Sequence, residues 1–301
     1  MNHNQKTVLI TGGCGFIGSH TVIELLAHGY NVKVLDREKP DYQIAEVEYI
    51  LGEITDVEVV TQSMQGVQYV LHTAAMSRSA PSNELWEECI VSNILGTGIV
   101  LKAASEVNVQ KFVYCGSSTY YGNQPGPQQE GLPPDLLNVY GITKYAGEEI
   151  TRVFDEFYDI PTLTLRYFNV YGPGQPSDEK NGLVMGIFLK KKLEGSSVVL
   201  DGGGLQTRDF IHVKDVARAN RLALESTFRN QVINIGSGQK TSILDLAELF
   251  DLPYSVAPAR QGDALTTEAD VGKAKELLGW VPVIGLAEGI SELITKNRVK
   301  K

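Results

Sequence analysis

Basic clusters, long apolar runs and paired cysteines are scarce in this 301-residue sequence, and each shortage argues against a class of protein. Acidic residues outnumber lysines and arginines by 36 to 27, which gives a net charge of −9, and no basic block interrupts the sequence. This charge argues against nucleic acid or an anionic membrane surface as the main partner. An anionic small ligand would therefore need local arginines to bind it.

The chain has only three cysteines, Cys14, Cys89 and Cys115. Their number is odd and their spacing fits neither a disulfide framework nor a zinc site, so we expect a reducing, cytoplasmic location and no metal. Six residues precede the first apolar strand, so we expect no signal peptide. We also expect no membrane span, because no apolar stretch approaches the roughly 20 residues that a bilayer requires.

Short apolar segments alternate with segments of helical spacing over the first 170 residues, and the hydrophobic fraction of 43% suffices for a sizeable core. We predict strands at residues 7–11, 31–35, 67–75, 111–118 and 161–172. We predict helices at residues 16–28, 86–107 and 140–158, with another helix between the second and third strands. Strands that alternate with helices form βαβ units, so the predicted fold is α/β, a Rossmann fold with a doubly wound parallel sheet.

Four glycines lie within seven residues directly after the first predicted strand, in TGGCGFIGSH. Here a helix N-terminus would direct backbone N–H groups and the positive end of its dipole at the loop. Gly12 would permit a sharp turn, Gly15 the close approach of a pyrophosphate, and Gly18 tight packing of helix on strand. A purely structural turn is the alternative.

The second predicted strand ends at Asp36, 18 residues after Gly18. A carboxylate at this place can accept hydrogen bonds from ribose hydroxyls and would repel a 2′-phosphate. The pattern therefore favours NAD over NADP as cofactor, although a solvated loop carboxylate would look the same in sequence.

Tyr140 and Lys144 lie four residues apart, so their side chains share one face of the predicted helix. A free tyrosine has a pKa near 10, and a nearby ammonium should lower that pKa by stabilising the phenolate. The pair would then provide a general base, although this spacing is also common on exposed helices. Ser117 and Ser118 end the preceding strand, where they would face a ligand or bond the local backbone.

The regular alternation of strands and helices stops after about residue 171. A loop at 172–182 and a helix at 183–195 follow, and a buried strand at 231–238 is expected to rejoin the sheet. We therefore expect an NAD-binding Rossmann domain at 1–170, with 211–240 rejoining it. Residues 171–301 would form mainly a smaller, discontinuous substrate-binding lobe over the carboxyl ends of the strands.

These residues together resemble the extended short-chain dehydrogenase/reductase family, within it the NAD-dependent nucleotide-sugar epimerases and dehydratases, and most closely the UDP-glucose 4-epimerase-like proteins. The resemblance covers nearly the whole chain and rests on an ordered series of motifs. They are TGGCGFIGSH, HTAA, NILGT, YGITK, LRYFNVYGPG, TRDFIHVKDVA, NIGSG, RQGD and LLGW.

The resemblance implies roles for individual residues. It implies a catalytic triad of Ser117, Tyr140 and Lys144. It implies that the cofactor contacts Gly12, Gly15, Phe16, Ile17, Gly18, Asp36, Glu53, Ile54, Ala74, Tyr140 and Lys144. It implies that the nucleotide sugar contacts Ser117, Asn169, Arg208, Arg260, Asp263 and Thr267, the two arginines holding the diphosphate unless they are ordinary surface residues. Asn93 would shape the helix near the site or act in catalysis.

The two positions after Ser117 separate branches of the family. The related 4,6-dehydratases carry Asp and Glu there, whereas this chain has Ser118 and Thr119, neither with a useful acid–base pKa. The resemblance therefore implies 4-epimerisation of a UDP-hexose, either UDP-glucose/UDP-galactose or the N-acetyl forms, through a 4-keto intermediate. Tyr140 would remove the proton of the 4-hydroxyl, Ser117 would bind the oxygen, and NAD would carry the hydride.

Other functions stay open on the sequence alone. A nucleotide-sugar 4-reductase, or another enzyme that handles keto sugars, would share the fold, and a non-catalytic NAD-binding sensor would not need the tyrosine and lysine that this chain keeps. The family resemblance further implies a homodimer through helices near 93–107 and 140–158. A small residue at Thr267 suggests that a 2-N-acetyl group is tolerated.

Overall fold

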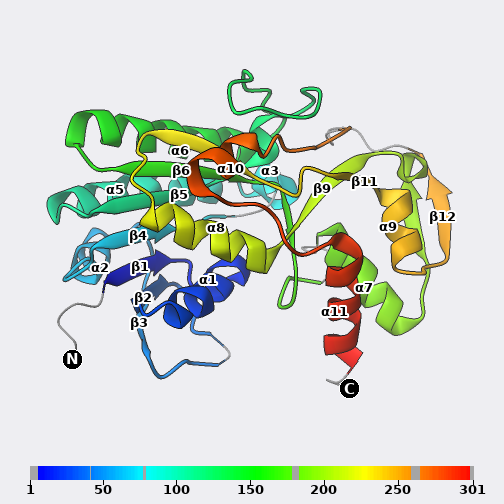
Figure 1. Cartoon of the computed structure of the whole chain (residues 1–301), viewed down its shortest axis with the longest axis horizontal. Coiled ribbons are helices and arrows are strands. Elements are labelled where there is room, and N and C mark those ends of the chain that lie inside the picture. The colour runs from blue at the N-terminus through cyan, green and yellow to red at the C-terminus, as the bar shows by residue number, and fades with distance from the viewer. Residues whose placement is uncertain (1–5, 41, 77–78, 178–182, 259–264, 299–301) are drawn as a thin grey trace.

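A computed structural model of the protein describes residues 6–40, 42–76, 79–177, 183–258 and 265–298. Within these residues the main element is a seven-stranded parallel sheet of order β10-β6-β5-β4-β1-β2-β3 (Figure 1). Its strands are β1 (Thr7–Thr11), β2 (Asn31–Asp36), β3 (Val47–Leu51), β4 (Tyr69–His72), β5 (Lys111–Ser117), β6 (Thr162–Tyr167) and β10 (Gln231–Ile235). This is the doubly wound arrangement of a Rossmann fold, so the predicted fold class is confirmed.

Both faces of the large sheet are covered by helices (Figure 1). One face carries α1 (Phe16–Ala27) and α8 (Val213–Glu225), and the other carries α2 (Val57–Ser63), α5 (Thr97–Glu106) and α6 (Val139–Tyr158). Along β1, Val8 and Ile10 pack into the apolar cluster beneath α1 and α8, and Leu9 packs into the cluster on the opposite face. A strand buried on both faces must be apolar throughout, which explains why β1 has no polar alternation.

The smaller lobe lies beyond the carboxyl end of β6 (Figure 1). It contains β7 (Asn169–Tyr171), β8 (Val198–Asp201), β9 (Thr207–His212), β11 (Lys240–Ser242), β12 (Tyr254–Ala257), α7 (Val184–Glu194), α9 (Ile243–Leu249) and α11 (Leu286–Arg298). The strands form a three-stranded sheet, β11-β9-β7, and a two-stranded sheet, β12-β8. A separate apolar cluster fills this lobe, while α10 (Gly272–Leu278) packs beside β10 and α8 of the larger part.

Two strand predictions differ from the structure. The segment 161–172 is two strands rather than one, because the chain breaks at Phe168, whose N–H donates to the carbonyl of Ile235 at 3.0 Å. The edge strand β3 has no counterpart in the prediction, so the strand predicted third is in fact β4. Glu48 and Leu51 of β3 are exposed, which removes the continuous apolar run by which the inner strands were identified.

The long helix predicted at 86–107 is present, but it is not uniformly α-helical. It consists of α4 (Trp86–Ile90), a π-helical turn at Val91–Gly96, and α5. By length and composition alone, this 21-residue helical run could cross a membrane, contrary to the expectation that no such stretch exists. In the fold, however, 44% of its most apolar segment is buried. Core helices pass the same test, and α5 packs against α2 and α6 inside the fold. The shorter helices are α3 (Ser79–Glu84) and two single turns, Ser118–Tyr120 and Gly202–Gly204.

Candidate active site

The glycine loop follows β1 at the carboxyl edge of the large sheet. Gly12 has a φ of +71°, a conformation that side chains other than glycine rarely adopt, and its N–H donates to Leu35 of the neighbouring strand at 2.8 Å. A Cβ on Gly18 would lie 2.3 Å from the Gly12 carbonyl oxygen, so only glycine lets α1 start this close to the turn. The sharp turn and the tight packing predicted from the sequence are both present.

The same loop has the features that a dinucleotide pyrophosphate needs. Gly15 is the N-cap residue of α1 and provides no side-chain cap, and the first turn holds no acidic residue, so its side chains bring no carboxylate that would compete with a phosphate. Asp36, at the end of β2, accepts a hydrogen bond from the Cys14 N–H at 2.9 Å and from the Glu38 N–H at 3.1 Å. Its carboxylate is thereby fixed beside the loop, so these residues fit NAD.

The other residues predicted to contact the cofactor lie around this loop. Phe16 and Ile17 are the first residues of α1. The N–H of Ala74 donates to Thr11 at 3.3 Å, and this backbone approaches Gly12 so closely that a Cβ there would clash with it. Ile54 is buried and Glu53 exposed, just beyond β3.

The predicted triad comes from two neighbouring elements. Ser117 is the last residue of β5, and Tyr140 and Lys144 lie on successive turns of α6, which packs against β5. The Tyr140 phenol lies near the Ser117 hydroxyl, which acts to lower the pKa of the phenol. Lys144 is buried, with its ammonium 4.2 Å from the centre of the Tyr114 ring. Lysine, phenol and hydroxyl are thus gathered at the carboxyl end of β5.

Burial dominates the electrostatics of this pair. It raises the pKa of Tyr140 to about 12, even though the hydrogen bond with Ser117 acts to lower that pKa. It also lowers the pKa of Lys144 to about 8, so the ammonium is itself destabilised. The pKa of Tyr140 therefore shifts opposite to the direction expected from the sequence, because desolvation of the phenol is the largest influence on it.

The amino end of α6 is held by side chains that the sequence analysis did not single out. Asn138 caps the helix by accepting from the Gly141 N–H at 2.9 Å. Ser82 accepts from the Tyr140 N–H at 3.1 Å, and Asn83 from the Val139 N–H at 3.4 Å. The helix α3 therefore satisfies donors that the first turn of α6 leaves free, and it fixes the backbone of Tyr140.

A buried ion pair anchors α6 one turn beyond Lys144. Glu148 accepts two hydrogen bonds from Arg166 of β6, from Nε at 3.0 Å and from Nη2 at 2.5 Å. The guanidinium also lies 3.5 Å from the centre of the Tyr120 ring and donates to the Tyr121 hydroxyl at 2.9 Å. The helix α6 is thus tied both to the sheet and to the turn that follows Ser117.

Asn93 lies in the π-helical turn and is fully hydrogen-bonded. Its side chain accepts from the Met76 N–H at 2.8 Å and donates to the Met76 carbonyl at 3.1 Å and to the Thr143 hydroxyl at 3.0 Å. It therefore joins the loop after β4 to α6, which supports the structural alternative of the two roles considered for it.

Two of the predicted substrate residues are in contact in the smaller lobe, and a third lies on a neighbouring strand. The amide of Asn169 donates to the Thr267 hydroxyl at 3.1 Å, and that hydroxyl also accepts from the Asp209 N–H at 3.1 Å. Arg208 precedes Asp209 on β9, next to β7 and its Asn169. Arg260 and Asp263 lie outside the described residues. Within the part of the chain that is described, no cluster of three His, Cys, Asp or Glu side chains could hold a metal ion.

Comparisons with known proteins agree with this geometry. Residues 8–236 match the model of the NAD dependent epimerase/dehydratase family. The chain belongs to this family. A putative UDP-glucose 4-epimerase of Methanocaldococcus jannaschii is 34% identical over 308 residues, which cover 95% of this chain and 97% of the relative.

Solved structures of the family lie close to this fold. The UDP-glucose 4-epimerase of Thermotoga maritima, solved with UDP-glucose, superposes with a TM-score of 0.93 at 33% identity, covering 98% of this chain and 99% of that one. The UDP-glucose 4-epimerase of Thermus thermophilus, solved with NAD, has a TM-score of 0.89 at 32% identity, with 97% and 99% covered. The resemblance inferred from the motifs is confirmed.

The contacts that position the start of α6 could not be read from the motifs. Val139 carries a backbone N–H there, and Asn83 accepts from it. The contacts made by Ser82 and Asn83 were missed because they join residues 56 to 58 positions apart, and no motif marks them. The Arg166–Glu148 pair was missed for a similar reason, although a charged residue inside the apolar strand LTLRYF could have suggested a buried partner.

Proposed function

We propose that this protein is an NAD-dependent nucleotide-sugar 4-epimerase that acts on a UDP-hexose through a transient 4-keto intermediate. The observation that carries the proposal is the arrangement at the end of β5: Ser117 ends the strand near Tyr140 of α6, and a buried lysine follows one turn later on the same helix. The positions next to Ser117 hold Ser118 and Thr119, which are no acid–base pair. Such a site can oxidise and reduce one carbon, whereas Ser118 and Thr119 are not suited to eliminating water.

Each residue of the triad has a definite task in this proposal. Tyr140, as a phenolate, accepts the proton of the sugar 4-hydroxyl, and returns it in the reverse direction. Ser117 donates a hydrogen bond to the same oxygen while that oxygen becomes a carbonyl. Lys144 supplies positive charge that favours the phenolate once the substrate covers the site. NAD, when bound on the glycine loop, accepts the C4 hydride and gives it back to the other face of the sugar.

The smaller lobe supplies the substrate contacts. Asn169, Arg208 and Thr267 lie near one another, and Arg260 and Asp263 complete the set proposed from the family motifs. A planar guanidinium suits a diphosphate, because its donors match the phosphate oxygens. We accordingly assign residues 1–170 with 211–240 to cofactor binding, and most of 171–301 to substrate binding.

We also propose a homodimer in the cytoplasm. Trp86, Ile90 and Leu95 on the long helix are 40–55% exposed, and Ile142 on the adjacent α6 is 49% exposed. Apolar side chains on two neighbouring helices fit a second copy that presents the same face. The three cysteines are all free thiols, in keeping with a reducing compartment.

The activity is tested by incubating the purified protein with a panel of UDP-, GDP- and dTDP-hexoses and following inversion at C4 by NMR. We expect UDP-glucose and UDP-galactose to interconvert without added cofactor, since each cycle regenerates NAD. Tyr140→Phe should abolish the reaction while leaving the NAD content, measured after denaturation, unchanged. A protein that released its cofactor and needed added NADH for each turnover would instead be a 4-reductase, and the epimerase assignment would be wrong.

A further inference from the structure

Thr119 contacts the catalytic serine twice. The single helical turn Ser118–Tyr120 follows β5, and Ser117 caps it by accepting from the Thr119 N–H at 3.3 Å. The Thr119 hydroxyl also donates to the Ser117 hydroxyl oxygen, at 2.9 Å. Both donors of one residue are therefore directed at one oxygen.

This arrangement restricts what the serine hydroxyl can do. A serine hydroxyl has one proton to donate and two lone pairs to accept with. Because two donors of Thr119 bond to the Ser117 oxygen, the hydroxyl proton of Ser117 is left to donate to another group. Ser117 also acts to lower the pKa of Tyr140, which fits a serine that donates toward the phenolate.

Thr119 is also held in place relative to the tyrosine. It is half-buried, and a Cβ on Gly141, the residue after Tyr140, would lie 3.3 Å from the Thr119 carbonyl oxygen and 3.7 Å from its Cβ. The start of α6 thus packs directly on Thr119. A side chain fixed between the serine and the catalytic helix can keep its hydrogen bond while the sugar above it turns.

We propose that Thr119 is a positioning residue that fixes Ser117 as a hydrogen-bond donor toward the reacting oxygen and the Tyr140 phenolate. The inference rests on the proposed function, because its value lies in the step in which a hydroxyl becomes a carbonyl. That step needs a donor that strengthens as negative charge develops, and a serine free to rotate would spend part of its time as an acceptor.

The test compares Thr119→Val, which removes the hydroxyl at nearly constant shape, with Thr119→Ser, which keeps it. Losing a hydrogen bond of about 1–1.5 kcal/mol corresponds to roughly a tenfold lower kcat. We expect that loss for Thr119→Val, with KM changed less than about twofold, the acidic limb of the kcat/KM profile moved to higher pH, and recovery in Thr119→Ser. In a Ser117→Ala background, Thr119→Val should have no further effect, because its target is gone.

Other outcomes overturn the inference. A rise in KM alone would make Thr119 a substrate contact. An acidic limb of the kcat/KM profile that does not move, or equal losses of kcat in Thr119→Val and Thr119→Ser, would leave Thr119 with a structural role only. The pKa of Tyr140 is also followed without turnover, by ultraviolet difference titration against Tyr140→Phe, and it should rise in Thr119→Val. If the wild type fails to epimerise any sugar while this titration still shifts, the function is wrong and the positioning of Ser117 by Thr119 stands.

Discussion

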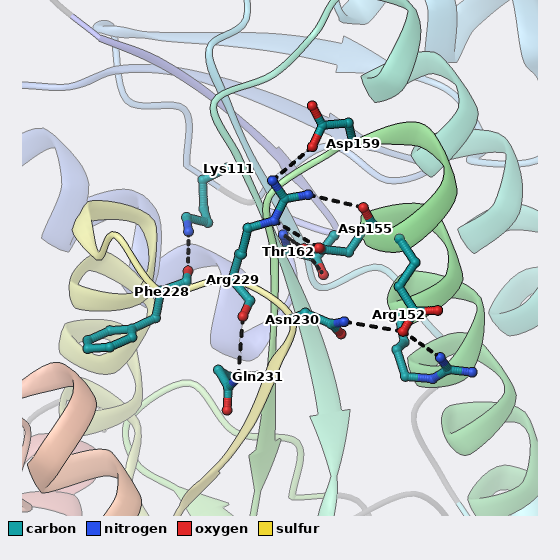
Figure 2. A network of polar contacts seen from close by, with 10 residues as sticks. Lys111, Arg152, Asp155, Asp159, Thr162, Phe228, Arg229, Asn230 and Gln231 are labelled. Carbon is teal, nitrogen blue, oxygen red and sulfur yellow. Dashed lines mark hydrogen bonds and ion pairs between the residues drawn. The ribbon is translucent and has the colours of Figure 1, made fainter.

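Two lysines are buried at opposite ends of the central sheet, and they differ in what surrounds them. Lys111 begins β5 and Lys144 lies beside its carboxyl-terminal half, and burial lowers the pKa of each to about 8. Lys111 donates to the carbonyl of Phe228, within a network of charges at the amino edge of the sheet (Figure 2). Lys144 instead faces an aromatic ring, one turn from Tyr140.

At the amino edge the charged groups bond to one another and to the backbone. Arg229 donates to Asp155 at 2.9 Å and to Asp159 at 2.8 Å (Figure 2). Asp155 also accepts from the N–H of Thr162 at 2.6 Å and from its hydroxyl at 3.1 Å. Such a network holds β6 and β10 to the end of α6.

The comparison shows that a perturbed pKa does not identify a catalytic residue by itself. The two lysines differ in their neighbours. At the amino edge, donors and acceptors bond to one another and to the backbone, whereas the carboxyl edge carries the glycine loop, Ser117 and Tyr140. The following predictions test that difference.

Replacing each lysine by methionine should give the largest difference in kcat between the two edges of the sheet. We expect Lys144→Met to lower kcat by roughly 10²–10⁴-fold, since the phenolate loses its supporting charge. Lys111→Met should leave kcat of the folded protein within about twofold. Kinetics on protein shown to be folded by circular dichroism provides the measurement, and similar losses in both variants would mean that the lysines are not distinct in function.

The glycine loop should be as sensitive to one methyl group as a core position. Gly18→Ala places a Cβ 2.3 Å from the Gly12 carbonyl oxygen, and overpacking of this kind costs about 1–3 kcal/mol. We expect NAD affinity, measured by calorimetry, to fall roughly 10- to 100-fold. Gly98→Ala, where a Cβ meets nothing within 4 Å, is the matched control and should bind NAD normally.

The network at the amino edge should affect stability and spare activity. Asp155→Ala leaves buried donors of Thr162 without a partner, so we expect unfolding free energy to fall by about 2–3 kcal/mol, measured by urea denaturation. Asp159→Asn is the control, because Asp159 is 90% exposed and its φ of +54° suits asparagine, so its effect should stay below about 0.5 kcal/mol. A large drop in kcat of folded Asp155→Ala would show that the two edges are coupled.

The pH dependence of stability should reveal both lysines. Each folded-state pKa, about 8, lies below the value of 10.5 expected for an unperturbed lysine. Between these values the unfolded chain binds more protons, so stability should rise with pH from about 8 to 10.5, and the penalty is fully present below 8. Urea denaturation at alkaline and neutral pH should show this rise, and Lys111→Met should reduce it by on the order of 1 kcal/mol.

The smallest expected effect concerns substrate choice. Thr267 is small and lies against Asn169, so we expect the wild type to accept UDP-N-acetylglucosamine as well as UDP-glucose. Thr267→Phe should reduce turnover of the N-acetyl sugar by roughly tenfold relative to UDP-glucose. A wild type that converts only UDP-glucose would contradict this reading of the pocket.

The sequence predicted the parts of the molecule in which local pattern decides the outcome. The glycine loop and α6 follow from the spacing of residues along a few turns. The contacts of Ser82, Asn83 and Arg166 could not be predicted in this way, because they join segments far apart in the chain. The direction of the Tyr140 pKa was missed for a related reason: desolvation depends on how many atoms pack around the phenol, which no spacing reveals.

The break at Phe168 has a consequence for how this molecule can adapt. A single residue separates β6 of the large sheet from β7 of the smaller lobe, and the N–H of Phe168 is bonded to the end of β10. Because this connection is short and is bonded to the large sheet, we expect the Rossmann part and the smaller lobe to move as one rigid body, without a hinge motion. A variant that accepts a different sugar would then need new side chains where the two parts meet, because the distance between the parts would stay constant.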